Sequence, residues 1–522
     1  MLLAYLNKEG KEVDEWDAVV VGAGVGGLST AVLLAQMGMK TLVVEKDDRV
    51  GGRALSMRGE ELKEKGPAWY RRLLGGQYSY LAEASPSLEE MADQGMLDDY
   101  IIDLGYHAVS AAGEGYFGTL RELIGGYGSR EVVINPCLTG SWIDGQYYQE
   151  PPLNKMQRLD DKMYAEYNRI GKRFSDFFAS FLGATPQQLE ELDRVSMHDH
   201  LVNIGFDQSK VVYDYMRCWG TLFTTINDPH DISLGDMVRY SLQVLMPALM
   251  KGEAVYVGGF TRNGIITWSE AIADRYADFG GELRLVTRLK SIEVEGGSVT
   301  GVRLEGDNGE EFIPTRRVVF SVPVQELFKY ADEKAFPADF ATRIKSLYGY
   351  GSLSPYIGLS GLPVPEDHAK RLMKTPCVVP RSEGFGWDVY MAWNIQSYIE
   401  PSCAPAGKHL FTAYLPLTEA ESHDRELVMK VVRAVPEFLE SVYSGFKECI
   451  EWELYPVCVK LEGVAKSVTQ AGSLKPDVKA PGLEGLFFAG DTARGYGVAM
   501  DCACSSGILC ASAITGLDYG IR

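Results

Sequence analysis

The chain has 522 residues, of which 46% are hydrophobic and 23% charged, as in an ordinary globular protein of several domains. Asp and Glu outnumber Lys and Arg by 71 to 51, and the net charge of −20 argues against a nucleic-acid partner, which requires a basic surface. The nine cysteines form no CxxC pair and no zinc-type cluster with histidine. We therefore expect no bound metal, reduced thiols and a cytoplasmic protein.

The first predicted element is a strand over residues 16–21, which are largely apolar and rich in valine. The motif Gly22-x-Gly24-x-x-Gly27 follows it directly, and residues 28–37 have the composition of a helix. Gly22 permits a tight turn, Gly24 lets the backbone approach a pyrophosphate, and Gly27 lets the helix pack close to the strand. The helix N-terminus would present oriented N–H groups to that pyrophosphate. This order of elements predicts a dinucleotide-binding unit.

A second predicted strand, residues 41–45, ends in an acidic residue 18 positions after Gly27. Glu45 can accept hydrogen bonds from the ribose hydroxyls of an adenosine, which is the role of the acid at this position of a dinucleotide fold. These features predict a Rossmann-like unit, but they do not choose between NAD and FAD.

Two further segments resemble the flavin-containing amine oxidase and phytoene desaturase superfamily. The first is Arg-Val-Gly-Gly-Arg at residues 49–53, with Lys-Gly-Pro at 65–67. In that superfamily the Gly-Gly-Arg run lies along the FAD pyrophosphate, and a guanidinium such as that of Arg53 pairs strongly with phosphates. The second is residues 485–491, an apolar strand that ends in Gly-Asp. It is followed by Gly-Tyr-Gly and by a helix of small residues over about 498–514.

The resemblance implies FAD as a non-covalently bound cofactor. Asp491 would accept a hydrogen bond from the ribityl chain, and the helix that begins near Val498 would direct its positive end at the flavin. A third block, residues 254–323, would return the chain to this domain and place the backbone of Val286 against the adenine. The implied cofactor-binding residues are Gly22, Ala23, Gly24, Gly26, Gly27, Glu45, Lys46, Gly52, Arg53, Val286, Gly490, Asp491, Gly497, Val498 and Ala499.

The predicted fold class is α/β, with a GR2-type Rossmann-like FAD-binding domain and a discontinuous α+β substrate domain. The FAD-binding domain is expected to comprise residues 14–95, 251–330 and 465–522, and the substrate domain residues 96–250 and 331–464. The chain would therefore leave the nucleotide domain and return to it twice.

The substrate domain is predicted to begin as helices. Residues 161–182 carry apolar and aromatic side chains at spacings of three to four residues. Such a helix can pack in the domain core, line an apolar entrance or touch a membrane surface, so a peripheral membrane contact is left open although no transmembrane segment is expected. The second insert has strand-like runs at 356–359, 389–393 and 409–415. Its aromatic residues suit a pocket wall and a sheet core equally well.

The sequence gives mixed signals about the reaction. The glycine-rich residues 124–128 lack the GxGxxG spacing, so we expect no NAD(P)H site. Amine oxidases of the superfamily usually have a lysine near the flavin N5, and the corresponding stretch, 348–359, has none. Its serine-rich turn resembles the desaturase and isomerase branch. Tyr496 precedes the C-terminal helix and could be one of the aromatic partners of an amine, so amine oxidation stays open.

The resulting hypothesis is an FAD-dependent oxidoreductase, closest to the phytoene desaturase-like branch. It would desaturate a hydrophobic small molecule by hydride transfer from a carbon to the flavin N5. The alternatives are a flavin amine oxidase, a redox-neutral polyene isomerase and an FAD-binding partner without activity. Tyr496 is the one catalytic candidate, because His107, His198, His200 and His230 are expected to be surface or packing residues. The substrate, the electron acceptor and the oligomeric state are left open.

Overall fold

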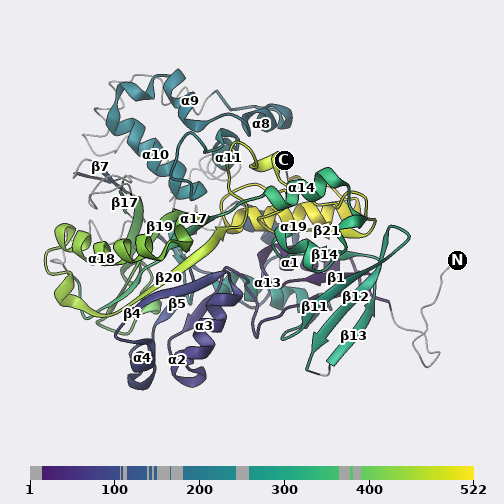
Figure 1. Ribbon diagram of the computed structural model, residues 1–522, viewed down its shortest axis with the longest axis horizontal. Helices are drawn as coiled ribbons and strands as arrows, with labels where there is room; N and C mark the ends of the chain where they lie inside the picture. Colours follow the sequence, from purple (N-terminus) through teal and green to yellow (C-terminus); the bar gives the residue numbers. More distant parts are fainter. Residues whose placement is uncertain are drawn as a thin grey trace.

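A computed structural model describes residues 15–105, 107–109, 115–137, 140–143, 146–149, 165, 180–242, 258–307, 309–363, 377–379 and 389–521. Two sheets dominate this part of the chain, with helices packed around them (Figure 1). The first sheet has five parallel strands in the order β10-β2-β1-β14-β21. Its strands are β1 (Ala18–Val21), β2 (Thr41–Val44), β10 (Glu282–Arg284), β14 (Val318–Phe320) and β21 (Leu486–Phe488). The parallel sheet and its flanking helices confirm the predicted α/β class.

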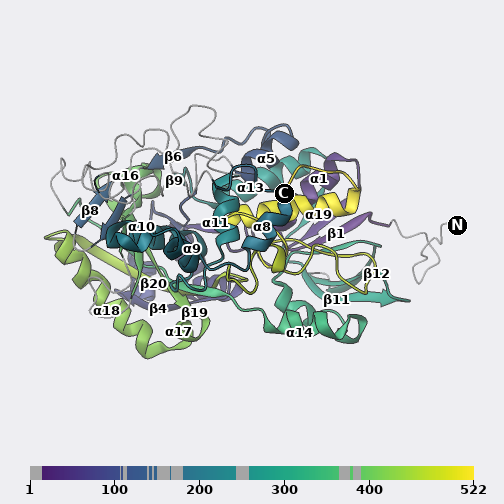
Figure 2. The same cartoon turned by 90° about the horizontal axis from the view of Figure 1, so that it is seen from above.

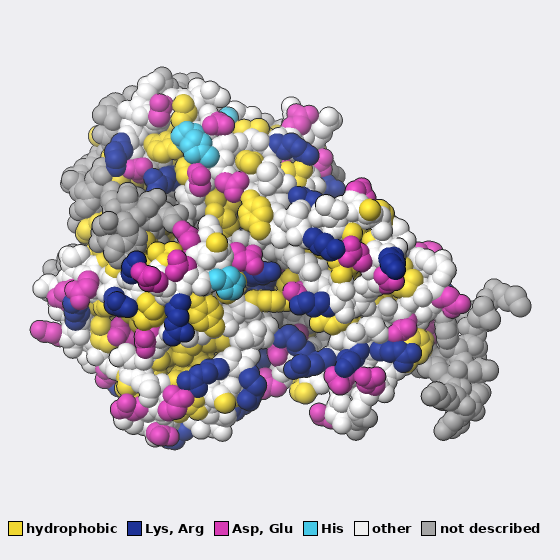
Figure 3. All heavy atoms as spheres, in the orientation of Figure 1, with side chains coloured by type: hydrophobic (Ala, Val, Ile, Leu, Met, Phe, Trp, Pro, Cys, Tyr) yellow, Lys and Arg dark blue, Asp and Glu magenta, His cyan; other side chains and the backbone are white. Residues whose placement is uncertain are grey.

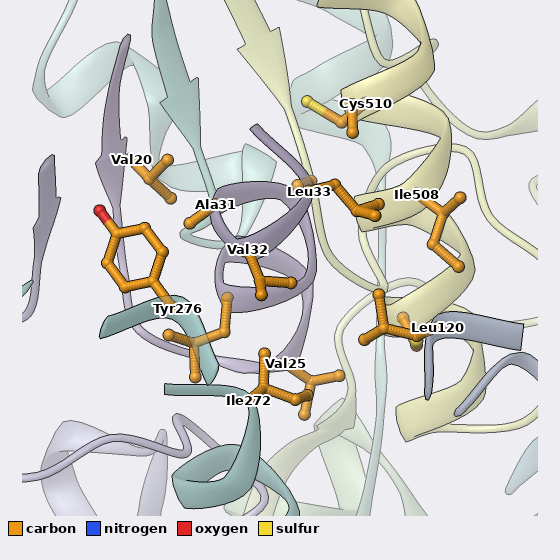
Figure 4. Packing of buried hydrophobic residues seen from close by; sticks show 14 of the residues in the cluster. Val20, Val25, Ala31, Val32, Leu33, Leu120, Ile272, Tyr276, Ile508 and Cys510 are labelled. Atoms are coloured by element: carbon orange, nitrogen blue, oxygen red, sulfur yellow. The ribbon is translucent and has the colours of Figure 1, made fainter. Parts of the chain in front are cut away.

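Three helices cover one face of this sheet: α1 (Val25–Gln36), α13 (Ile266–Asp278) and α19 (Met500–Thr515). They pack on Val20 and Val43, which share a hydrophobic cluster with all three helices. Figure 4 shows Ala31 of α1 and Tyr276 of α13 near Val20, with Ile508 and Cys510 of α19 on the other side of α1, and Figure 2 shows the helices lying side by side. The predicted strand–helix–strand unit is therefore confirmed as β1, α1 and β2.

An antiparallel meander covers the other face of the parallel sheet. It consists of β11 (Arg288–Glu295), β12 (Ser298–Gly306) and β13 (Gly309–Pro314). Val19 and Leu42, which point away from the helices, lie in one hydrophobic cluster with this meander. The central strands β1 and β2 are buried along their whole length, because both of their faces are covered.

The second sheet is antiparallel and has seven strands. They are β4 (Ser79–Ser85), β15 (Tyr350–Leu353), β16 (Tyr356–Leu359), β17 (Cys377–Val379), β18 (Met391–Ile395), β19 (His409–Thr418) and β20 (Ile450–Glu462). The long helix α18 (Arg425–Val442) packs on it. Strand β4 pairs with β20, so the predicted segment 14–95 contributes strands to both sheets.

A group of four helices lies on the opposite side of the molecule from α2 (Glu60–Lys65), α3 (Pro67–Gly76) and α4 (Leu88–Gln94) (Figure 1). These helices are α8 (Pro186–Leu192), α9 (Met197–Asn203), α10 (Lys210–Thr224) and α11 (Leu234–Tyr240). They share one hydrophobic cluster, which Tyr350 and Ala465 also join. The predicted helix over residues 161–182 lies almost wholly outside the described residues. Within the described part of the chain, no helix combines the length and apolar character needed to cross a membrane.

Shorter elements complete the architecture. The two-stranded pairs are β3 (Ser56–Arg58) with β5 (Ile101–Asp103), β6 (Ile134–Cys137) with β9 (Gly258–Thr261), and β7 (Gly140–Ile143) with β8 (Gln146–Gln149). The remaining α-helices are α2 (Glu60–Lys65), α3 (Pro67–Gly76), α4 (Leu88–Gln94), α5 (Tyr116–Leu123), α14 (Ala338–Ser346), α16 (Gln396–Ile399) and α17 (Glu419–His423). Pairing of β6 with β9 brings the first insert back to the chain segment that leads into α13.

Candidate functional site

One large cavity, of about 550 Å³, joins the glycine motif to the second sheet and the four-helix group. Its nucleotide end is lined by Gly22, Gly24, Gly26, Glu45, Lys46, Gly52, Arg53, Gly490, Asp491, Val498 and Ala499. Its other end is lined by His107, Leu222, Phe223, Thr225, Tyr414, Leu461 and Glu462. The structure therefore brings most of the sequence-predicted cofactor residues to the wall of one cavity, which residues of the second sheet and the four-helix group also line.

The glycine motif forms a cradle that only small residues can make. Gly22 has a φ of +104° and donates its N–H to the carbonyl of Val44 at 2.8 Å, which continues the sheet into the turn. A methyl group on Gly27 would lie 2.1 Å from the carbonyl oxygen of Gly22. Helix α1 begins at Gly24 without a side-chain cap, so its first N–H groups are available to an anion. This donor set fits a pyrophosphate.

Glu45 lies at the end of β2 and is only 6% exposed. One carboxylate oxygen accepts the N–H of Ala23 at 2.8 Å, and the other accepts the N–H of Asp47 at 3.0 Å. Burial raises the pKa of Glu45, while these two hydrogen bonds act to lower it. Each oxygen keeps a second lone pair for a ribose hydroxyl. The residue therefore also ties the glycine turn to β2, a task that its sequence position did not reveal.

Arg53 and Asp491 were predicted to contact different parts of the cofactor, and the structure pairs them with each other in an ion pair. Arg53 also donates to the carbonyl of Lys460 at 3.0 Å, and Asp491 accepts the N–H of Gly463 at 2.8 Å. Burial acts to raise the pKa of Asp491, but Arg53 and Lys475 outweigh it and hold the carboxyl below its ordinary pKa. The guanidinium therefore joins the Gly-Gly-Arg turn to the end of β20, beside the predicted phosphate position.

The C-terminal flavin motif closes tightly on the glycine motif. A methyl group on Gly26 would lie 2.6 Å from the Cα of Gly490, and one on Gly507 would lie 2.4 Å from the carbonyl oxygen of Gly26. Helix α19 begins at Ala499 without a side-chain cap, and its first residues line the cavity. Gly497 has a φ of +99°. The N-termini of α1 and α19 thus both open on the cavity, and each can stabilise negative charge there.

Lys46 and Val286 lie at the outer, adenine end of the predicted site. Lys46 lines the cavity and donates to the Gly76 carbonyl at 2.9 Å. Val286 is 49% exposed, has a φ of +51° and donates its N–H to the Asp47 carbonyl at 3.1 Å. A positive φ is unusual for a β-branched residue and marks a constrained turn. Its neighbour Thr287 lines the cavity and donates its N–H to the Glu45 carbonyl at 2.8 Å, so the adenine contact of Val286 stays a prediction.

Tyr496, the catalytic candidate from the sequence, lines a different cavity of about 260 Å³. The Arg239 guanidinium lies over its ring at 4.7 Å from the centroid, and its hydroxyl accepts a hydrogen bond from Arg494 at 3.1 Å. These contacts turn the side chain away from the large cavity, although Val498 and Ala499 next to it line that cavity. We therefore assign Tyr496 a packing role and do not propose it as a substrate contact.

His107 is a cavity residue that sequence reasoning placed on the surface or in a packing role. It follows Asp103, which is 4% exposed and accepts hydrogen bonds from the Ser56 hydroxyl at 2.6 Å and the Ile265 N–H at 2.9 Å. Burial lowers the pKa of His107, against an opposing effect of the Asp103 carboxylate. The available sequence signal was the spacing of an acid and a histidine, four residues apart, after a short strand.

The stretch without a lysine, residues 348–359, is not a turn beside the flavin site. It contains the whole of β15 and β16, and the hydroxyls of Ser352 and Ser354 are buried and 2.8 Å apart. Among the described residues that line the large cavity, none comes from this stretch. The missing lysine therefore says little about the chemistry in the cavity.

The fold and the cavity define a class: a Rossmann-like flavoprotein whose nucleotide site opens on a substrate-sized space. The chain belongs to the flavin containing amine oxidoreductase family, whose sequence pattern matches residues 25–515. Membership of this family makes FAD the expected cofactor and an FAD-dependent oxidation the expected activity.

Curated relatives share only parts of the sequence. Amine oxidase [flavin-containing] A of Sus scrofa is 25% identical over 227 residues, covering 42% of this chain and 33% of the relative. Pseudooxynicotine dehydrogenase of a Pseudomonas species is 23% identical over 322 residues, covering 60% and 52%. All-trans-retinol 13,14-reductase of Danio rerio is 62% identical over 39 residues, covering 8% and 6%. The chain thus matches about half or less of the length of each of these relatives.

Solved structures match nearly the whole chain. An oxidoreductase from Methanosarcina mazei has a TM-score of 0.64 at 13% identity, covering 94% of this chain and 98% of that one. Cyclohexylamine oxidase from Brevibacterium oxydans has a TM-score of 0.57 at 16% identity, covering 96% and 99%. Rab GDI from Plasmodium falciparum has a TM-score of 0.55 at 12% identity, covering 97% and 99%. At these identities the likeness establishes the fold.

Proposed function

We propose that the protein dehydrogenates a hydrophobic organic molecule. The molecule would be held at the inner end of the large cavity, which is the end away from the glycine motif. The observation that supports this most is the continuity of the cavity, which runs from the glycine cradle to a wall containing Leu222, Phe223, Tyr414 and Leu461. Bound FAD would supply a two-electron acceptor for a hydride from the substrate carbon. The chain itself would orient the substrate and exclude water.

The inner wall is held rigid from both sides. The Tyr414 hydroxyl donates toward the carbonyl of Leu222 at 3.3 Å, and the Tyr390 hydroxyl donates to the carbonyl of Cys218 at 2.9 Å. These bonds fix α10 on strands β18 and β19. Phe223, at the end of α10, is 6% exposed and presents its ring to the cavity. Such fixed apolar side chains recognise an apolar substrate through its shape and keep solvent away from the reacting carbon.

His107, which lines the cavity and has its Nε2 3.4 Å from the carbonyl oxygen of Leu104, is our candidate for the group that receives the proton from the neighbouring substrate carbon. Its lowered pKa keeps the imidazole neutral at neutral pH, which is the form that accepts a proton. The buried Asp103 carboxylate would stabilise the imidazolium that results. Loss of a hydride from one carbon and a proton from the next leaves a C=C bond in the product.

Amine oxidation is the second candidate, and two observations favour it. The curated relatives include amine oxidases, and a cavity wall with the Glu462 and Asp491 carboxylates can attract a cation. Glu462 is paired with Lys466 at 2.7 Å, and Asp491 with Arg53, so neither carboxylate is uncompensated. We rank desaturation first because the inner wall carries mainly apolar side chains.

Anaerobic mixing with two panels of compounds tests the proposal. One panel holds cyclic and polyene hydrocarbons, ketones and acids, and the other holds primary and secondary amines. Bleaching of the flavin absorbance by members of the first panel is the expected result, with a product containing a new C=C bond. Bleaching by amines alone, with aldehyde or imine products, would make the protein an amine oxidase. NADH and NADPH serve as controls and are expected to leave the flavin oxidised.

A further inference from the structure

Two histidines that are 32 positions apart in the sequence lie against each other on the helical side of the molecule. His198 is in the first turn of α9, and His230 is in the loop before α11. Their ring centroids are 3.7 Å apart. Figure 3 shows histidine side chains with acidic ones beside them over the α9 and α10 region.

The backbone holds these two segments in register. The His198 N–H donates to the carbonyl of Pro229 at 3.2 Å, and the Met197 N–H donates to the carbonyl of Ile232 at 2.9 Å. The loop is itself shaped by the His230 N–H, which donates to the Asp228 carboxylate at 2.9 Å. The two imidazoles therefore stand on a backbone framework that is fixed without any ligand, as a preorganised site requires.

A carboxylate completes the cluster. Asp199 follows His198 on α9, and its oxygen lies 4.0 Å from the Nδ1 of His230. One ligand atom from each of His198, Asp199 and His230 lies within 4.8 Å of the other two. Ligand atoms on a tetrahedral zinc ion are separated by about 3.3 Å, given metal bonds of about 2.0–2.2 Å. Asp199 and His230 are exposed, so their side chains are free to rotate, and metal binding would move the His230 ring away from the ring of His198.

A second set of groups around His198 suits a metal ligand. The hydroxyl of Tyr213 lies 2.5 Å from the Nδ1 of His198, which fixes the ring and leaves the Nε2 atom as the free nitrogen. Metal-binding histidines are oriented in this way by a hydrogen bond to the other ring nitrogen.

We propose that His198, Asp199 and His230 bind a divalent transition-metal ion of the zinc type, with water in the remaining coordination positions. Two imidazoles and one carboxylate form a ligand set that zinc and its neighbours bind well. None of the three residues lines the large cavity, so the ion would stabilise the fold rather than take part in oxidation. It would join α9 to the loop at 226–233, which also pairs with the chain after β20 through Ile232 and Ser467.

Metal titration of the FAD-loaded protein without a polyhistidine tag tests the proposal. Zinc chloride is titrated by calorimetry, and cobalt chloride is followed by the d–d absorption that appears when Co²⁺ takes a tetrahedral site with nitrogen ligands. We expect one saturable site, with affinity at least about tenfold weaker in His230→Gln and in Asp199→Asn. His423→Gln, which removes another exposed histidine, should bind like the parent.

Thermal unfolding gives an independent measurement on the same proteins. Zinc should raise the unfolding temperature of the parent and of His423→Gln, because a ligand that binds only the folded state stabilises it, and should have no such effect in His230→Gln. FAD content, read from the flavin absorbance, verifies that each variant is folded. Equal zinc affinity in the parent and His230→Gln, or no saturable binding by the parent, would overturn the proposal.

Discussion

Glu45 holds three partners together at the residue scale: the glycine turn, the turn after β2 and, by our prediction, a ribose. Glu45→Ala should weaken FAD binding by about 1–3 kcal/mol, because it removes hydrogen bonds to a charged acceptor and frees the N–H of Ala23. The measurement is flavin occupancy after gel filtration, together with the FAD dissociation constant from fluorescence. Glu89→Gln, at an exposed acid on α4, is the control. Equal occupancy in Glu45→Ala and the parent would mean that the ribose is bound elsewhere.

His107 should leave a signature in the pH dependence of flavin reduction. The neutral imidazole accepts the proton, and burial lowers its pKa from the ordinary 6.5, so the rate should be constant above pH 6.5 and fall at lower pH. His107→Asn should reduce the flavin more slowly with the first compound that bleaches the parent, and should lose this acid limb. Stopped-flow absorbance measures both effects.

His409→Asn is the matched control for that experiment. His409 is also partly buried with a lowered pKa and contacts the Ser397 hydroxyl at 3.0 Å, but it does not line the cavity. Its rate and pH profile should match those of the parent. If the rate of flavin reduction by His107→Asn still falls at low pH as in the parent, His107 is not the proton acceptor. The proposed dehydrogenation would stand as long as a compound of the first panel reduces the flavin of the parent.

Residues with a local sequence signal were easier to predict than residues that depend on tertiary contacts. Gly22, Gly24 and Glu45 follow fixed spacings after a strand, and all three line the large cavity. Tyr496 was placed by its position before the last helix, yet its side chain is held by Arg239 from a distant helix. The pairing of His198 with His230 likewise depends on a loop contact that no local spacing encodes.

At the element scale, helix α1 packs closely against the flavin motif at residues 485–491. Gly26→Ala should lower both the unfolding temperature and the FAD affinity, because its methyl group would lie 2.6 Å from the backbone of Gly490. Overpacking of this kind costs about 1–3 kcal/mol. Thermal unfolding and flavin occupancy measure the change.

Gly75→Ala provides the opposite outcome in the same assay. Gly75 is inside helix α3, and a methyl group there has nothing within 4 Å. Alanine favours helix over glycine by up to about 1 kcal/mol, so this variant should be as stable as the parent or more stable. A Gly26→Ala protein with the parent's stability and FAD content would show that the two turns can move apart without loss.

The buried strands and helices of the nucleotide domain could be predicted because their sequences are apolar, short and bounded by glycine. Strand β4 was not assigned to the second sheet, because its partner β20 is more than 360 residues away in the chain. Residues 348–359 were likewise not predicted to lie in the second sheet, where they pair with the distant strands β19 and β20. Sequence periodicity predicts an element, but the identity of its neighbours is decided by tertiary packing.

At the scale of the whole molecule, a buried ion pair joins the four-helix group to the chain that leads into β21. Arg239 and Asp193 are at most 1% exposed, and Asp193 also accepts the N–H of Ser473 at 2.9 Å. Arg239→Met should destabilise the protein by about 3–5 kcal/mol, because it leaves a buried carboxylate without its cation. Urea unfolding followed by tryptophan fluorescence measures the loss.

The double variant Arg239→Met with Asp193→Asn separates charge from packing. The neutral amide of asparagine can still accept from Ser473, and residue 193 then carries no charge, so the double variant should recover part of the lost stability. Equal stability of the single and double variants would instead attribute the loss to the other neighbours of Arg239, the buried Asp236 carboxylate at 3.9 Å and the Tyr496 ring.

The nucleotide domain combines segments that are far apart in the sequence, so they are synthesised at different times. Gly26 leaves the ribosome about 460 residues before β21 and α19 exist, which corresponds to roughly 25–90 s at ordinary rates of translation. During that interval the apolar surface of α1 that later meets α19 lacks its partner. FAD binding that uses the N-termini of both helices therefore follows the synthesis of α19, and the face of α1 that meets α19 is open to a chaperone until then.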